Sequence, residues 1–333
     1  MLFKKLSISL IIVVTLLFQS FYVFAAEVFI GGQSIGIELS YEGVMITGTY
    51  DISIDNKKYN PASDGYLSGD LITHVNGTRV TSISHLMQCV EKEIEMNHSI
   101  TLTLKRDNKE ITKELCFQKN DDKFSTGLYV QDGLTGIGTL TYYNPATQHF
   151  AALGHIMKDT SLSSDMSIQK GVIYDSYVKK VIPSQNGEPG EKIAEMGSIE
   201  LGTVFDNNNF GIYGEYNQEI TSYAEKQLIS TASIDEVEEG KAYFLTVLDG
   251  HTITKCEINI THLKKQNKPS IKGITFEITD KNVLTSANGV IQGMSGSPII
   301  QNGKLIGCVT HVDVHNVHQG YGLYIDWMLE NDK

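Results

Sequence analysis

The sequence predicts a mainly β protein, built as two folded units behind an apolar N-terminal segment. Short runs that alternate apolar and polar residues recur along the chain, and Gly, Asn and Asp lie between them, as in strands joined by tight turns. The 333 residues, 41% hydrophobic and 20% charged, are enough for about two hydrophobic cores. We therefore expect three segments: residues 1–26, 27–120 and 121–333.

The N-terminal segment, residues 1–26, has the layout of a secretory signal. Two lysines precede an apolar run, Ile8–Phe18, and the small residues Ala25 and Ala26 end the segment. This pattern predicts export, with cleavage after Ala25. If the segment stays uncut, it predicts a membrane anchor, because its apolar stretch is just long enough to span a bilayer.

Composition excludes some functions. A net charge of −12 argues against a nucleic-acid-binding surface, which needs basic patches that neutralise phosphates. The four cysteines are widely spaced and include no Cys-x-x-Cys pair, so they match neither a zinc ribbon nor a dense disulfide framework. We expect them to be small buried apolar residues.

Residues 27–120 predict a small β unit with one helix. Asn76-Gly77 is a strong hairpin turn after the strand Leu71–Val75. A helix is expected to begin near Ser84, which can cap it, and to end near Glu95. Two alternating strands then follow around the turn at residues 107–108.

The stretch "SGDLITHVNGTRV", residues 68–80, resembles the signature of PDZ domains. The resemblance implies that residues 27–120 form a PDZ domain. Such domains bind peptide C-termini through backbone amides of a loop before their second strand, and the peptide then adds to a sheet edge. The matching positions here are Ser34, Ile35, Gly36 and Ile37, in "QSIGIEL".

Residues 121–333 predict a β-barrel or β-sandwich. Alternating or β-branched runs such as "GVIYDSYVKKVI", "KCEINITHL" and "GKLIGCVTHV" are separated by turn residues. Helical patterns are limited to "YAEKQLISTAS", residues 223–233, and to the C-terminal "YIDWMLEN". This unit is therefore expected to be almost entirely β.

The stretch "GMSGSP", residues 293–298, predicts a nucleophile. Glycines around Ser295 let the backbone turn so that the amides of Gly293 and Ser295 point at one spot, an oxyanion hole. The segment resembles the nucleophile segment of trypsin-like serine proteases, which implies a double β-barrel fold. Asn302-Gly303 predicts a hairpin turn after the strand that follows.

A serine nucleophile needs a base and a group that orients the base. His155 follows an apolar run and a glycine in "FAALGH", and His before Ser is the trypsin-like chain order. Five aspartates between them have no distinctive context: Asp165, Asp175, Asp206, Asp235 and Asp249. Asp280 lies instead shortly before the nucleophile, at the end of a predicted strand.

The order of these motifs resembles the sporulation stage IV B serine peptidase family. The resemblance rests on "ALGH", "TD", "NGVIQGMSGSPI" and "VTHV" behind a PDZ-like segment. It implies a catalytic Ser295, His155 and Asp280, with no cofactor.

The resemblance also implies a biological role. Members are serine endopeptidases of endospore-forming bacteria, exported across the forespore membrane to the intermembrane space, secreted or tethered to a membrane. They cleave themselves near the N-terminus and cleave a regulatory partner of an intramembrane protease, which triggers late mother-cell gene expression. The chain is also compatible with a paralogue that has another substrate.

Other functions remain open at this point. The segment after Thr310 offers four metal-ligating side chains, His311, Asp313, His315 and His318, but a continuing β pattern would point them to opposite sides. A general exported quality-control protease usually carries its PDZ domain after the protease domain. A non-catalytic PDZ adaptor is the third alternative, although all three candidate catalytic residues are present.

Overall fold

The computed structural model describes residues 26–94, 99–107, 109–120, 123–158, 170–217 and 228–332. The predicted signal segment therefore lies outside the described residues, except for Ala26. No helix in the described part is long and apolar enough to cross a membrane. The prediction of a mainly β chain is confirmed, because strands dominate. All four cysteines are described and are free thiols; Cys256 and Cys308 are buried as expected, whereas Cys89 and Cys116 are only partly buried.

Six strands form a closed antiparallel ring, which we call barrel 1. Each strand pairs with the next, and the first also pairs with the last. In order around the ring they are β2 (Ser34–Thr49), β11 (Leu128–Asn144), β12 (His149–Ala152), β15 (Gly211–Tyr216), β14 (Glu191–Asn208) and β13 (Lys170–Ile182). Two short strands, β1 (Glu27–Ile30) and β16 (Leu228–Ser230), extend the sheet beyond β11.

The C-terminal part of the chain forms a second closed six-stranded barrel, barrel 2. Its strands are β17 (Gly240–Asp249), β18 (Thr252–Leu263), β19 (Ile274–Ile278), β22 (Asn316–Tyr324), β21 (Lys304–Asp313) and β20 (Pro298–Gln301). Three short helices accompany it: η3 (Ile234–Glu236), α3 (Lys281–Ala287) and the predicted C-terminal helix α4 (Ile325–Leu329). Buried Phe244 and Phe276 pack against each other in its core.

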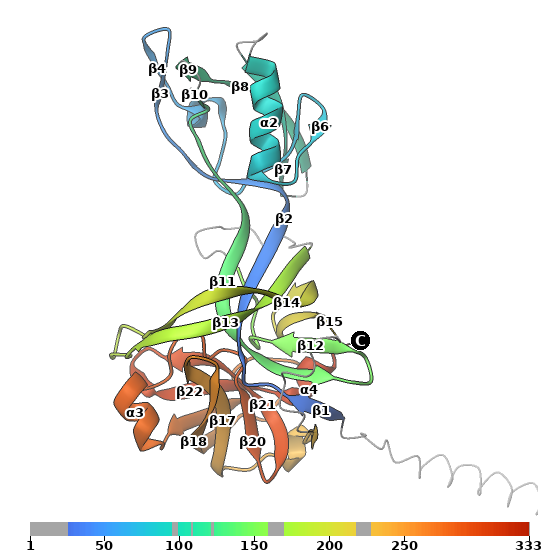
Figure 1. The fold of residues 1–333 in the computed structure, drawn as a ribbon, viewed down its shortest axis with the longest axis vertical. Coiled ribbons are helices and arrows are strands. Elements are labelled where there is room, and N and C mark those ends of the chain that lie inside the picture. The colour runs from blue at the N-terminus through green and yellow to red at the C-terminus, as the bar shows by residue number, and fades with distance from the viewer. Residues whose placement is uncertain are drawn as a thin grey trace, which may run out of the picture.

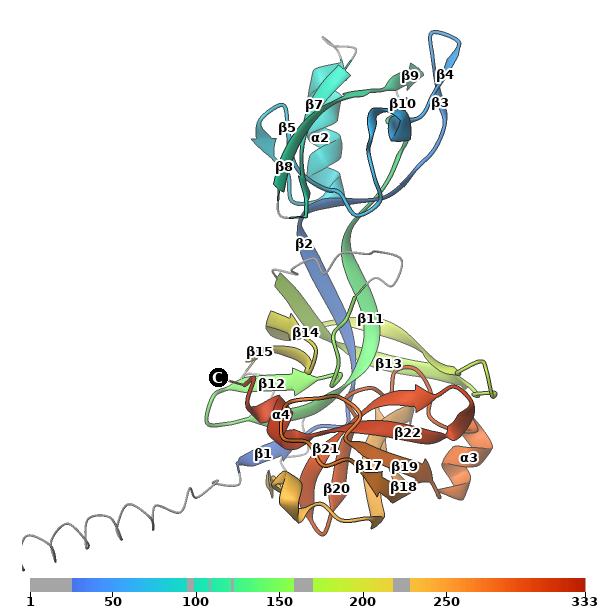
Figure 2. The same ribbon diagram turned by 180° about the vertical axis from the view of Figure 1, so that it is seen from behind.

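A third unit stands apart from the two barrels (Figures 1 and 2). We call residues 44–130 the upper unit, since they hold a separate apolar core. It contains β3 (Ile52–Ile54), β4 (Lys57–Tyr59), η1 (Pro61–Asp64), β5 (Leu71–Val75), β6 (Thr78–Arg79), α2 (Ile83–Ile94), β7 (Ser99–Arg106), β8 (Lys109–Cys116), β9 (Gln118–Asn120) and β10 (Lys123–Ser125). The long strands β2 and β11 connect it to barrel 1, as Figure 1 shows in blue and green.

Local sequence signals predicted several of these elements well. The strand Leu71–Val75 is β5 as expected, and the turn after it has Asn76 and Gly77 at φ 46° and 80°. Asn302 and Gly303 likewise adopt φ 51° and 76°. Positive φ at both central residues is the geometry that Asn-Gly favours in a two-residue hairpin.

The predicted boundary between the units is wrong. Residues 27–40 belong to barrel 1 rather than to the upper unit, which is an insertion between β2 and β11. The predicted peptide-binding loop, Ser34–Ile37, is part of β2. Strand β11 pairs with one of its edges, and β13 pairs with the other as far as Ile35. Its apolar side chains face the barrel 1 core, so this stretch is not an amide-lined loop beside an open sheet edge.

The predicted helical stretch at residues 223–233 lies partly outside the described residues. Its described part contains the strand β16 and the residues that follow it.

Candidate active site

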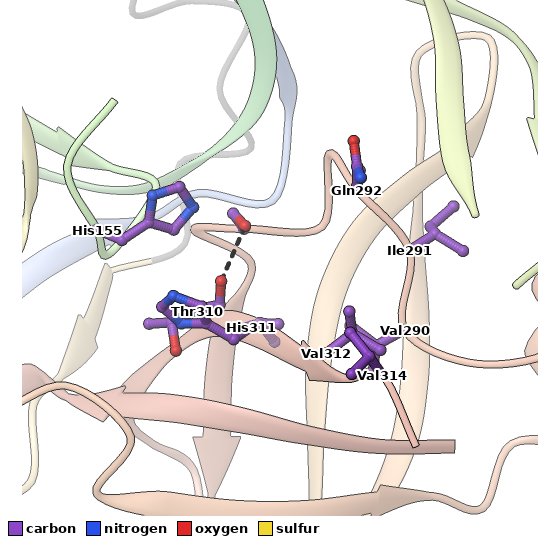
Figure 3. Close-up of a pocket in the computed structure, with 10 residues that line it drawn as sticks. His155, Val290, Ile291, Gln292, Thr310, His311, Val312 and Val314 are labelled. Carbon is purple, nitrogen blue, oxygen red and sulfur yellow. Dashed lines mark hydrogen bonds between the residues drawn. The ribbon is translucent and has the colours of Figure 1, made fainter. Parts of the chain in front are cut away.

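The structure brings His155 and Ser295 to the same pocket. His155 follows strand β12 of barrel 1, and Ser295 lies in the loop between α3 and β20 of barrel 2. The pocket has a volume of about 280 Å³. The residues that line it are His155, Val290, Ile291, Gln292, Ser295, Val309, Thr310, His311, Val312 and Val314 (Figure 3).

Glycines shape the turn that carries Ser295. Gly293 and Gly296 have φ of 91° and 89°, a region that L side chains rarely adopt. A Cβ atom on Gly296 would lie 2.1 Å from the carbonyl oxygen of Thr139, so barrel 1 leaves no room for a side chain there. The Ser295 hydroxyl donates a 3.1 Å hydrogen bond to the carbonyl of Thr310, drawn as the dashed line in Figure 3.

His155 is held in the form that a general base needs. Its Nδ1 lies 2.9 Å from the carbonyl oxygen of Ile156, and a carbonyl only accepts, so Nδ1 carries the proton. Nε2 is then the nitrogen that can take a proton from a nucleophile. Burial lowers the pKa of His155 below its ordinary value of 6.5, which keeps the ring neutral at neutral pH.

The backbone around His155 is tightly constrained. Leu153 and Gly154 both have φ of 68°, and a Cβ atom on Gly154 would lie 2.4 Å from Sγ of Cys308 in barrel 2. Asn207 on β14 forms two hydrogen bonds with the backbone of Met157, one in each direction. The segment after β12 is therefore pinned between the two barrels.

A second histidine, His311, lies beside the first. The ring centroids of His155 and His311 are 5.4 Å apart, and both rings lie on the opposite side of the pocket from Val312 and Val314 (Figure 3). Burial lowers the pKa of His311 to about 4, with smaller contributions from His155 and Lys272. The His311 ring is therefore neutral at neutral pH, and it forms part of the pocket wall. The sequence analysis did not predict this role.

The alternative of a metal site receives no support from the geometry. Within the described ranges, no three His, Cys, Asp or Glu side chains gather in a way that could hold a metal ion. Asp313 instead accepts hydrogen bonds from the Tyr321 hydroxyl and the His315 amide, and His318 lies 3.3 Å from the side chain of Asn288.

The structure does not bring Asp280 to His155. Asp280 is the N-cap of α3, and its Oδ1 accepts hydrogen bonds from the amides of Asn282 and Val283 at 2.9 and 3.1 Å. Among the described residues, no carboxylate forms a hydrogen bond or ion pair with His155. The orienting role predicted for Asp280 therefore has no contact to support it, and the Ile156 carbonyl occupies Nδ1 instead.

The other aspartates do not fill that role either. Asp165 lies outside the described residues. In the part of the chain that is described, no hydrogen bond or ion pair joins His155 to Asp175, Asp206, Asp235 or Asp249.

The two predicted oxyanion-hole amides flank the serine. The carbonyl of Gln292 accepts a 3.0 Å hydrogen bond from the amide of Lys192, so the Gly293 amide, across the same trans peptide, points the opposite way. Over the described ranges, neither the Gly293 amide nor the Ser295 amide donates to another group of the protein. An acyl-transfer intermediate requires such free donors, so these two amides are the candidates for the oxyanion hole.

Comparison with known families identifies the chain. The model of the family SpoIVB peptidase S55 matches residues 122–329, which is more than half of the sequence. The chain belongs to this family. It is a serine peptidase, and the matched region contains both His155 and Ser295.

Solved structures give weaker similarities. The Rv3671c protease from M. tuberculosis in its active form is 14% identical, with a TM-score of 0.33, over 59% of this chain and 72% of that one. Deg5 is 15% identical, with a TM-score of 0.34, over 59% of this chain and 81% of that one. Scores this low carry no argument about this peptidase. A search of curated proteins returned no match.

Proposed function

We propose that this serine peptidase is an endopeptidase in which Ser295 is the nucleophile and His155 the general base. The observation that carries the proposal is their position in one pocket of an S55-family chain, with two unpaired amides beside the serine. In the structure the Ser295 hydroxyl donates to the Thr310 carbonyl, so in this mechanism it turns away from that carbonyl to donate to Nε2 of His155.

The reaction then follows from the positions of these groups. Ser295 attacks the peptide carbonyl while His155 takes its proton, and the amides of Gly293 and Ser295 stabilise the negative oxygen that forms. His155 next gives the proton to the leaving amine, and an acyl-enzyme remains on Ser295. Water, activated by the neutral His155, hydrolyses the acyl-enzyme and restores the serine.

We also propose a preference for an apolar side chain at the bond to be cleaved. Among the described residues that line the pocket, His155 and His311 are the only ones with a charged or titratable side chain. Val290, Val312 and Val314 lie together on one wall (Figure 3). A buried charge without a partner would be costly on such a wall, so charged substrate side chains are disfavoured there.

The biological setting is proposed on the resemblance given by the sequence motifs. The protein is exported through its N-terminal signal segment to the space between forespore and mother cell, where that segment is cleaved or remains as a tether. It cleaves itself and a regulatory partner of an intramembrane protease. The upper unit, which carries the PDZ-like motif at residues 68–80, selects protein substrates.

A labelling experiment tests the proposed chemistry. A fluorophosphonate probe is expected to label the wild-type protein and to leave Ser295→Ala unlabelled, with both variants folded by circular dichroism. N-terminal sequencing of any self-cleaved product is expected to show an apolar residue before the cut. Equal labelling of Ser295→Ala would reject the serine mechanism, and a cut after Lys, Arg, Asp or Glu would reject the proposed preference.

A further inference from the structure

A buried lysine lies directly under the turn that carries the nucleophile. Lys192 is the second residue of β14 and is only 5% exposed. A Cβ atom on Gly293 would lie 2.9 Å from Cδ of Lys192 and 3.1 Å from its Cγ. The aliphatic stem of Lys192 therefore packs against the backbone of Gly293, the residue whose amide is one of the two oxyanion donors.

Among the described residues, the side-chain nitrogen of Lys192 donates only to hydroxyls. Nζ lies 2.9 Å from Oγ1 of Thr246 on β17 and 3.4 Å from Oγ1 of Thr139 on β11. Both threonines are fully buried. In the part of the chain that the structure describes, no carboxylate pairs with Lys192.

Thr139 continues this contact to the nucleophile turn. Its hydroxyl donates a 2.8 Å hydrogen bond to the carbonyl oxygen of Gly293. A carbonyl only accepts, so the single hydroxyl proton of Thr139 goes to Gly293, and Nζ of Lys192 must donate to Thr139. The backbone amide of Lys192 meanwhile holds the carbonyl of Gln292. Lys192 thus acts on both peptide units that flank the α-carbon of Gly293.

Folding alone gives no reason for a lysine at this position. Removing an ammonium from water without an acidic partner is costly, and an apolar side chain of similar length would fill the same space without that cost. Burial lowers the pKa of Lys192 from 10.5 to about 7, which shows how unfavourable the charged form is here. A buried lysine without an acidic partner destabilises the fold, and destabilising residues of this kind are expected at functional sites.

We propose that Lys192 is a positioning residue for the oxyanion hole. Its backbone amide holds the Gln292 carbonyl, which sets the direction of the Gly293 amide, and its side chain holds the Gly293 carbonyl through Thr139, which keeps the turn between the two donor amides in place. This inference rests on the serine mechanism proposed above. It predicts an effect on the chemical step rather than on binding, because the oxyanion exists only in the transition state.

The test measures how fast the full-length protein reacts with a fluorophosphonate over a range of probe concentrations. Saturation kinetics separate the maximal labelling rate from the probe affinity. Lys192→Met, which keeps the length of the side chain and removes its charge, is expected to lower the maximal rate by about tenfold, less than the roughly hundredfold or greater loss caused by removing an oxyanion donor. The probe affinity is expected to stay unchanged, and the melting temperature to stay equal or rise.

Matched variants separate positioning from a merely structural role. Thr139→Val breaks the hydrogen-bond chain and is expected to lower the maximal rate as Lys192→Met does, whereas Thr139→Ser keeps the hydroxyl and is expected to restore it. Lys180→Met is the control, because Lys180 is exposed on the adjacent strand β13 and pairs with Ile193. It is expected to label at the wild-type rate.

Three results would overturn the inference. The first is an unchanged maximal rate in Lys192→Met. The second is a lower melting temperature of Lys192→Met together with a wild-type rate in Thr139→Val, which would identify a structural lysine. The third is failure of wild-type protein to label at all, which would overturn the proposed function as well. If Lys192→Met does not fold, the maximal labelling rates of Thr139→Val and Thr139→Ser are compared instead. Equal rates in these two variants would overturn the inference.

Discussion

The two barrels contribute to the active site in different ways. Barrel 2 is built from one stretch of chain, β17 to β22, and it supplies Ser295 and most of the pocket wall. Barrel 1 is built from separated stretches, with the upper unit inserted between β2 and β11, and it supplies His155 and Lys192. The nucleophile therefore depends on local sequence, whereas its activation depends on strands that come from distant parts of the chain.

Hydrogen bonds across the junction explain how the two halves stay aligned. The amide of Thr139 donates to the carbonyl of Ser295 at 2.9 Å, and the hydroxyl of Thr141 donates to the carbonyl of Gly296 at 2.8 Å. Both threonines lie on β11 and both are fully buried. One strand of barrel 1 thus fixes the nucleophile turn of barrel 2 at several points.

The largest predicted effect concerns the limits of barrel 1. Deleting residues 27–120, the unit that local sequence patterns suggest, also removes β1 and the barrel 1 part of β2. We expect this deletion to abolish folding of the peptidase, because the ring loses a strand that pairs with both β11 and β13. Circular dichroism and fluorophosphonate labelling measure the loss.

A matched deletion preserves the ring. Replacing residues 41–132 by Asn-Gly joins Ser40 to Gly133, which already face each other across β2 and β11. A two-residue turn of this type closes an antiparallel pair. This variant is expected to fold and to label with the fluorophosphonate. If it did not fold while the 27–120 deletion did, the assignment of residues 27–40 to barrel 1 would be wrong.

The second prediction concerns the activity of barrel 1's histidine. His155 must be neutral to accept a proton, and burial lowers its pKa, so the labelling rate is expected to rise with pH through a midpoint below 6.5. A series of labelling rates between acidic and neutral pH measures this midpoint. A midpoint above 6.5 would show that a negative group stabilises the charged ring, contrary to the contacts of His155.

The smallest predicted effect concerns Asp280 of barrel 2. Asp280→Ala removes the cap of α3 and is expected to lower the free energy of unfolding by about 1 kcal/mol. Asp280→Asn is expected to keep most of the wild-type stability, because asparagine also caps helices. Urea unfolding measures both. If Asp280→Asn were as stable as wild type but labelled a hundred times more slowly, its carboxylate would be the missing partner of His155.

Local patterns predicted the parts of the structure that local chemistry decides. Ser295 could be recognised because its turn requires glycines at positive φ on either side, and the Asn-Gly turns and β5 follow from similar rules. His155 could be paired with it through chain order together with its place after an apolar run and a glycine in "FAALGH".

Long-range pairing decided what the sequence analysis missed. The apolar alternation of Ser34–Leu39 fits a strand, but its partners lie in β11 and β13, which no local pattern reveals. The burial of Lys192 could not be predicted either, because nothing in the sequence of its strand distinguishes it from the exposed lysines. Only the structure shows that its side chain packs against Gly293. Asp280 was chosen by motif resemblance, which does not specify the contacts of a side chain.

The continuity of β11 has a mechanical consequence. Near its start Leu128 packs in the core of the upper unit, and further along the same strand Thr139 and Thr141 hold the loop that bears the serine. No flexible linker separates these positions. A displacement of the upper unit that moves Leu128 would therefore act on the same strand that positions the loop of Ser295.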